Sequence, residues 1–177
     1  MSAPLPSVTK RRVIALIVAA LVFGVDQWVK MLMLGEFALP DVGQIYVLPF
    51  FNLTWTENYG VSLGMLTAQS VEMRYLLVAL TSLISLVVLV WMMREKAWPE
   101  LLGLAFVLGG AIGNIRDRFT RGYVIDYADF HIDGFRPFLI FNIADAAITI
   151  GVLIILARSL FSREKPKPET EQAAPES

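Results

Sequence analysis

Four stretches of this 177-residue chain are long enough and apolar enough to cross a lipid bilayer as helices. The hydrocarbon core of a bilayer is about 30 Å thick, so a spanning helix needs roughly 20 residues. Apolar residue types make up 56% of the chain, which is more than a soluble domain of this size can bury. We therefore expect one all-α membrane domain over residues 1–162, whose four transmembrane helices span about 13–34, 75–93, 101–118 and 138–157.

Lysine and arginine residues predict the orientation of these helices, because they are enriched in cytoplasmic loops. Basic residues precede the first stretch, separate the second from the third and follow the fourth, whereas the loop 35–71 has none. Both termini should then be cytoplasmic, and both longer loops should lie outside. Four arginines from the end of the third stretch onward break this rule, and we expect them to pair with aspartates or to contact substrate: Arg116, Arg118, Arg121 and Arg136.

The two ends of the chain need separate interpretations. Lys10 to Arg12, before an apolar run, are compatible with a cleaved signal peptide. However, no small-residue cleavage site precedes Asp26, and the apolar run continues beyond it, so a retained helix is favoured. Residues 163–177 are rich in Pro, Glu and Lys and are typical of a disordered cytoplasmic tail.

Composition excludes several kinds of chemistry. The chain has no cysteine, which removes disulfides, thiolate nucleophiles and cysteine-based zinc sites. It has one histidine, His131, so a histidine-rich metal site cannot be built and a Ser-His-Asp triad would depend on that residue. A net charge of −1 without long basic runs argues against a nucleic-acid partner. No metal or cofactor is expected, and hydrolysis would fall to Asp and Glu, or to Ser with Lys.

Two outer segments are rich in β-branched and aromatic residues. Residues 44–55, QIYVLPFFNLTW, have Pro49 in the middle and predict two short strands, after which Asn58-Tyr59-Gly60 marks a turn. Residues 123–132, YVIDYADFHI, have the same character. We expect a small sheet on the outer membrane surface. An interfacial aromatic belt is the alternative, and the two can hold together.

Carboxylates inside the apolar stretches are the strongest functional signal. An ionised Asp at the centre of a membrane helix costs about 2.5–3.5 kcal/mol, so such residues face the protein interior and are functional candidates. Asp145 lies about seven residues into the fourth stretch, which would place it about two turns below the outer surface. Asp126 precedes it by 19 residues, which lets the intervening loop fold back and bring the two together.

Other polar residues also have structural interpretations. Asp26 and Lys30 are four residues apart on one helix face, so they either form an intrahelical pair or take part in catalysis. Asp117 and Arg118 either brace a helix end or belong to the site. Three asparagines are turn or packing residues in the simplest interpretation, and two aspartates are solvated loop charges: Asn58, Asn114 and Asn142, and Asp129 and Asp133.

Two carboxyl groups held close together cannot both ionise easily, so they share a proton and their pKa values separate. The ionised member can take a proton from an attacking water, and the protonated member can donate one to a peptide carbonyl. This chemistry serves an aspartic protease and needs neither metal nor cysteine. A proton-coupled transporter would use the same residues as relay groups, and a non-catalytic membrane scaffold is a further alternative.

Five short motifs occur in order along the chain: DQWVK (26–30), NYG (58–60), GGAIGNIRDR (109–118), GYVIDYADF (122–130) and FNIAD (141–145). Together they closely resemble the signature of the lipoprotein signal peptidases, the type II signal peptidases of bacteria. The order, the spacing and the predicted topology agree over about residues 13–160.

The resemblance implies four transmembrane helices, a small periplasmic β-cradle and a short outer helix. It implies an aspartic endopeptidase of the bacterial inner membrane, which works as a monomer among membrane lipids. Such an enzyme removes the signal peptide from diacylglyceryl-modified prolipoproteins, cutting before the lipidated cysteine. By matching position, Asp126 and Asp145 would be the catalytic pair, and Asp26 with Lys30 a structural pair. Five further positions match residues that bind substrate or support the site: Asn58, Asn114, Asp117, Arg118 and Asn142.

Three positions depart from the usual family pattern. An aliphatic residue often stands where this chain has Arg116, and Ser often stands where it has Ala146. The Asn-x-Gly motif is usually followed by Ala and Phe, whereas Val61-Ser62-Leu63 follow here. Both aspartates are unaffected, so these departures bear on substrate fit and not on the reaction.

Overall fold

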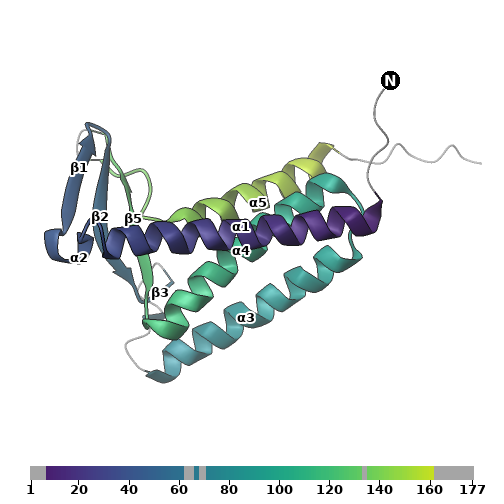
Figure 1. Ribbon diagram of the computed structural model, residues 1–177, viewed down its shortest axis with the longest axis horizontal. Helices are drawn as coiled ribbons and strands as arrows, with labels where there is room; N and C mark the ends of the chain where they lie inside the picture. Colours follow the sequence, from purple (N-terminus) through teal and green to yellow (C-terminus); the bar gives the residue numbers. More distant parts are fainter. Residues whose placement is uncertain (1–6, 62–65, 68–70, 133–134, 162–177) are drawn as a thin grey trace, which may run out of the picture.

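Four long helices form the main body of the computed structural model, which describes residues 7–61, 66–67, 71–132 and 135–161. Each helix is long enough and apolar enough to cross a membrane, which confirms the predicted four spans. Figure 1 shows the start of the first and the end of the last at the same end of the bundle. The predicted tail, 163–177, and Asp133 lie outside the described residues. The helices are α1 Val8–Leu34, α3 Val71–Arg94, α4 Trp98–Thr120 and α5 Ile143–Phe161.

Helix α4 is the centre of the bundle and packs against α1, α3 and α5. Glycines on α4 allow this close approach, because small residues let helix backbones come together in a membrane. A Cβ atom added at Gly109 would lie 2.5 Å from the carbonyl oxygen of Ala19 in α1. One added at Gly103 would lie 2.8 Å from the carbonyl oxygen of Gly151 in α5. The glycine-rich third stretch is therefore the helix on which α1 and α5 are assembled.

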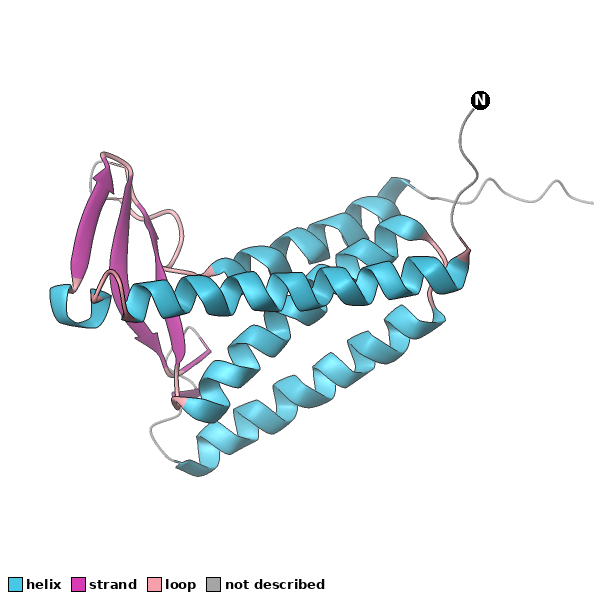
Figure 2. Cartoon of the chain, viewed as in Figure 1, coloured by secondary structure: helices cyan, strands magenta, loops and turns pink. Residues whose placement is uncertain are grey.

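A small antiparallel sheet covers one end of the bundle (Figures 1 and 2). Its strands β1 Gln44–Leu48, β2 Phe51–Asn58 and β5 Val124–Phe130 lie in the order β1-β2-β5. The four-residue helix α2, Leu39–Val42, leads into β1. The predicted small sheet is confirmed, and its third strand comes from the segment that joins α4 to α5. Two further strands pair with each other, β3 Gly60–Val61 and β4 Leu66–Thr67.

The fourth helix begins later than the predicted span of 138–157. Helix α5 starts at Ile143. Phe141 instead forms a bridge with Ala128 of β5, so it belongs to the sheet, and Phe138 and Leu139 precede the helix with 66% and 70% of their surface exposed. The prediction that Asp145 lies about seven residues into the helix is therefore wrong, because it stands in the first turn of α5, beside the sheet.

Candidate active site

Asp126 lies in the middle of β5 and is 1% exposed. The chain reaches this strand from α4 through Gly122, whose φ of 93° lies in the left-handed region that favours glycine. Both carboxyl oxygens of Asp126 face amide donors. Oδ1 accepts a hydrogen bond from Asn142 Nδ2 at 2.6 Å, and Oδ2 accepts one from Asn58 Nδ2 at 3.0 Å. Asn58 Oδ1 accepts from the Gly60 N–H at 3.1 Å, which fixes the direction of that amide.

Asp145 is held by the N-terminal cap of α5. The Oδ1 atom of Asn142 accepts from the Asp145 N–H at 2.9 Å, and Asp145 Oδ2 accepts from the Asn142 N–H at 3.4 Å. This reciprocal pairing is a capping box, in which two side chains satisfy backbone N–H groups at a helix start. The other oxygen of Asp145 accepts from Asn114 Nδ2 at 2.8 Å. The positive end of the helix dipole also favours a negative charge here.

Asn142 joins the two carboxyl groups. Besides its 2.6 Å contact with Asp126, Nδ2 lies 3.2 Å from the Ile125 carbonyl oxygen and 3.3 Å from Asn114 Oδ1. One buried amide therefore contacts Asp126 directly, and it reaches Asp145 through the helix cap and through Asn114. The two aspartates and three asparagines that were predicted separately form one hydrogen-bonded cluster.

Lys30 extends this cluster into the bundle. Its ammonium lies 2.9 Å from Asp26 Oδ2, 2.7 Å from Asp117 Oδ2 and 3.2 Å from Asn114 Oδ1. The side chains of Lys30, Asp26 and Asp117 are fully buried. An ammonium only donates, so Asn114 presents its oxygen to Lys30 and its amino group to Asp145. The intrahelical pair of Asp26 and Lys30 expected on α1 is present. Because Lys30 holds the oxygen of Asn114, it also orients the Asn114 amino group toward Asp145.

Burial dominates the electrostatics of Asp126. Loss of solvent and then the neighbouring charge of Asp145 raise the pKa of Asp126 to about 7, while the N–H groups of Asn58 and Asn142 oppose the rise. Asp126 thus keeps a proton at a pH where an isolated aspartate has lost it.

These acidic groups are not arranged as metal ligands. Among residues 7–61, 66–67, 71–132 and 135–161, no group of three or more histidine or acidic side chains is placed to hold a metal ion. His131 lies beside the sheet, where its Nε2 atom is 2.9 Å from Asn52 Nδ2. That the protein works without a metal or cofactor stays a prediction.

A family model described as signal peptidase (SPase) II matches residues 18–161 of the sequence. This chain belongs to the signal peptidase II family. Two curated relatives are both named lipoprotein signal peptidase. The one from Sphingopyxis alaskensis is 50% identical over 150 residues, which are 85% of this chain and 87% of the relative. The one from Rhizorhabdus wittichii is 52% identical over 151 residues, which are 85% and 88% of the two chains.

The fold agrees with this assignment. A solved bacterial membrane enzyme matches with a TM-score of 0.71 at 28% identity, over 85% of this chain and 92% of that one. The resemblance to signal peptidase II inferred from five motifs is therefore confirmed. As a signal peptidase II with four candidate spans, the chain is a multi-pass membrane protease. Nothing in these similarities supports the transporter interpretation.

Arg118 of this signal peptidase II is partly buried and lies near the carboxyl groups of Asp145, Asp126 and Asp117. Within the described part of the chain, the Nε atom of Arg118 is buried and has no hydrogen-bond partner. A buried donor without a partner is costly, so this atom is suited to a substrate carbonyl.

Two other outer arginines form the ion pairs predicted for them. Arg121 Nη1 lies 2.9 Å from Asp117 Oδ1, and Arg136 Nε lies 2.8 Å from Asp129 Oδ1. The expectation that Asp129 is a solvated loop charge is wrong, because it is 1% exposed and also accepts from Thr54 Oγ1 at 2.8 Å. It sits on β5 opposite Asn52, a pairing that the local sequence does not reveal.

Gln27 is a site-supporting residue that sequence reasoning missed. Its Nε2 atom donates to Asp26 Oδ2 at 3.0 Å and to Asp117 Oδ1 at 3.3 Å, and its Oε1 accepts from Arg116 Nη1. Gln27 therefore connects Arg116, which departs from the family pattern, to the buried ion cluster of Lys30, Asp26 and Asp117. The available signal was a polar amide beside Asp26 inside an apolar run.

Proposed function

We propose that this chain is an aspartic endopeptidase that removes the signal peptide from diacylglyceryl-modified prolipoproteins, cutting before the lipidated cysteine. The relatives of 50% and 52% identity are named lipoprotein signal peptidases, which supports the substrate class. The observation that carries the catalytic type is the hydrogen-bonded cluster in which Asn142 links the carboxyl groups of Asp126 and Asp145.

In this mechanism the aspartate pair shares one proton. The ionised member takes a proton from water as the water oxygen attacks the peptide carbonyl carbon, and the protonated member donates its proton to the carbonyl oxygen. When the tetrahedral intermediate collapses, the C–N bond breaks and the proton taken from water passes to the leaving amine, while one hydroxyl of the intermediate returns its proton to the other carboxylate and becomes the carbonyl oxygen. Arg118 is placed to donate a hydrogen bond to a substrate carbonyl, and the asparagines keep both carboxyl groups in position.

The membrane position follows from the basic residues and from the sheet. We place both termini in the cytoplasm and the sheet outside, in the inner membrane of a bacterium. The scissile bond of a lipidated prolipoprotein then lies at the level of Asp145, in the first turn of α5. All the site residues named here come from one chain, so a monomer is sufficient for this reaction.

Cleavage by the purified protein in liposomes tests the function. We expect a diacylglyceryl-modified prolipoprotein to be cut so that the modified cysteine becomes the new N-terminus, which mass spectrometry identifies. The same precursor without the lipid is the matched control and should remain uncut. If neither the lipidated nor the unlipidated precursor is cut, the proposal is wrong. Proton-coupled flux in the same liposomes, without proteolysis, would favour the transporter.

The pH dependence of cleavage provides a second prediction. The shared proton is present below the raised pKa of Asp126, about 7, and is lost as the pH rises through that value. We therefore expect kcat/KM to fall above about pH 7. The Asn58 N–H favours the ionised form of Asp126, so Asn58→Ala should move this decline to higher pH. Initial rates across the pH range for both proteins measure the shift, and a shift to lower pH would contradict the assignment.

A further inference from the structure

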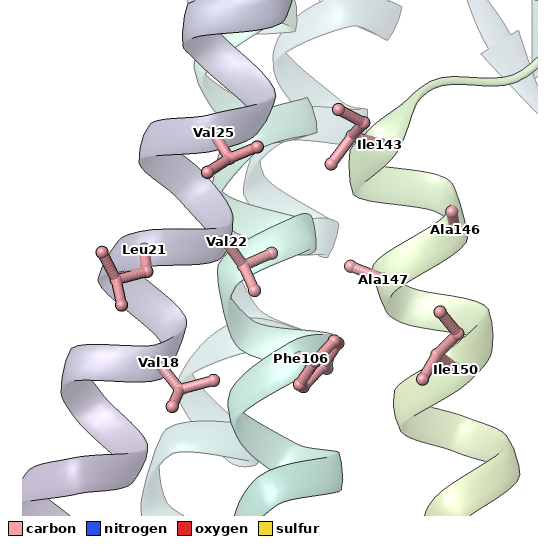
Figure 3. Close-up of a pocket in the computed structure, with 9 residues that line it drawn as sticks. All are labelled: Val18, Leu21, Val22, Val25, Phe106, Ile143, Ala146, Ala147 and Ile150. Carbon is pink, nitrogen blue, oxygen red and sulfur yellow. The ribbon is translucent and has the colours of Figure 1, made fainter.

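Two grooves of equal size flank α5 near the aspartate pair. The first, the α1 groove, lies between α1 and α5, with Phe106 of α4 between these two walls, and is lined by the residues labelled in Figure 3. The second, the Asp145 groove, lies between α5 and the segment 138–141 that precedes it. Each has a volume of about 370 Å³. Both are lined by Ala146 and Ile150, which are one turn apart and form a ridge between them.

Both grooves begin at the level of the candidate active site. Asp145 itself lines one, and Ile143, the residue after the Asn142 cap, lines the outer end of the other. From Ile143 to Ile150 the helix advances about 10 Å, so the grooves run from the carboxyl pair into the hydrocarbon core. Every residue that lines the α1 groove is apolar, and in the Asp145 groove only Asp145 and Thr149 are polar.

We propose that the α1 groove and the Asp145 groove each receive one acyl chain of the substrate's diacylglyceryl group, with Ala146 and Ile150 separating the two chains. This inference rests on the proposed function. A diacylglyceryl group carries two acyl chains on one glycerol, and it is attached to the cysteine next to the scissile bond. When that bond lies at the aspartate pair, both chains must leave from the same point, and two apolar grooves diverge there.

The ridge is narrow at its outer end, because Ala146 carries only a methyl group. The chains can therefore separate directly below Asp145.

Substitutions that fill one groove test the proposal. Val22→Trp fills the α1 groove, and Leu139→Trp fills the Asp145 groove. Leu153→Trp is the matched control, because Leu153 is on α5, is 58% exposed and lines neither groove. Each groove variant should raise KM for a long-chain diacylglyceryl prolipoprotein about tenfold, the loss expected from roughly two buried methylene groups. The kcat of each variant, its KM for a short-chain substrate and both constants of the control should stay nearly unchanged.

Equal losses on long-chain and short-chain substrates, or no loss on either, would overturn the grooves as acyl sites. A wild-type protein that cuts no lipidated prolipoprotein would instead overturn the proposed function. A labelling experiment tests the proposal without requiring that the tryptophan variants fold. A prolipoprotein with photoreactive acyl chains, bound to the Asp126→Asn protein, should label α1 within 18–25 and the segment 138–141. The control uses a photoreactive phospholipid in place of the substrate. If the phospholipid labels the same residues equally and the substrate does not displace it, the grooves hold ordinary membrane lipid and the proposal is wrong.

Discussion

Replacement of Asp126 or Asp145 by asparagine is expected to lower kcat/KM for a lipidated prolipoprotein by at least about 10³-fold. Asparagine has nearly the same shape, but its amide can neither take a proton from water nor pass one to a leaving group. The fold should persist, because the new side chain keeps one acceptor oxygen for Asn142 or Asn114. Initial cleavage rates, measured together with thermal unfolding in detergent, separate the loss of chemistry from a loss of structure.

The matched control for this experiment lies on the same strand. Asp129 is also 1% exposed, but it is three residues from Asp126 and so points to the opposite face of β5, where it pairs with Arg136. Asp129→Asn should leave turnover within a few-fold of wild type. Near-normal turnover in either variant of the pair would show that Asp126 and Asp145 are not the catalytic dyad. If Asp129→Asn lost as much turnover, the cause would be disruption of β5 and not the loss of a catalytic carboxyl group.

Lys30→Met should cost about 3–5 kcal/mol of stability, because removing one partner of a buried ion pair leaves its charge uncompensated. Here the ammonium contacts two buried carboxylates, and after its loss Asp117 keeps its ion pair with Arg121 while Asp26 loses its pair with Lys30. The remaining folded protein should also cleave slowly, since Asn114 is then free to rotate its amino group away from Asp145. Thermal unfolding and the cleavage rate per folded molecule measure the two effects.

Arg158→Met is the matched control for Lys30→Met, because it also removes one positive charge from an ion pair. Arg158 lies 2.6 Å from Glu100 and is 35% exposed, so we expect a loss of about 1 kcal/mol or less. Adding Asp26→Asn to Lys30→Met removes one of the stranded carboxylates and should restore part of the stability. If Lys30→Met unfolds at the same temperature as Arg158→Met, the buried cluster does not stabilise the bundle as its geometry implies.

Much of the fold could be predicted because the bilayer restricts the choices. Length and hydropathy were sufficient for four helices, and the β-branched and aromatic run around Pro49 was sufficient for the first two strands. The pair of Asp26 and Lys30 followed from helical spacing. The residues proposed for the site came from five motifs in register, since burial in the membrane alone made Asp26 as strong a candidate as Asp145.

Other features depend on contacts between distant segments. Hydropathy counted the residues before Asn142 as helix, because it cannot distinguish an apolar chain lying on a sheet from an apolar chain in lipid. The start of α5 was signalled only by the capping pair Asn142 and Asp145. Burial of Asp129 depends on Arg136 and on β2, and the link from Lys30 to the site depends on how closely α4 packs against α1.

The buried ion cluster also bears on how the chain is inserted into the bilayer. Lys30 is four residues from Asp26 on α1, and Arg121 is four residues from Asp117 on α4. Each buried carboxylate thus has an oppositely charged residue one turn away on its own segment before the helices meet, and α4 also carries Arg116 and Arg118 beside Asp117. The ion pair between Lys30 and Asp117 is then added when the helices meet, and both intrahelical pairs persist beside it. Neither Asp26 nor Asp117 therefore has to be presented to lipid as a lone carboxylate, so insertion of the helices and assembly of the bundle can take place as separate steps.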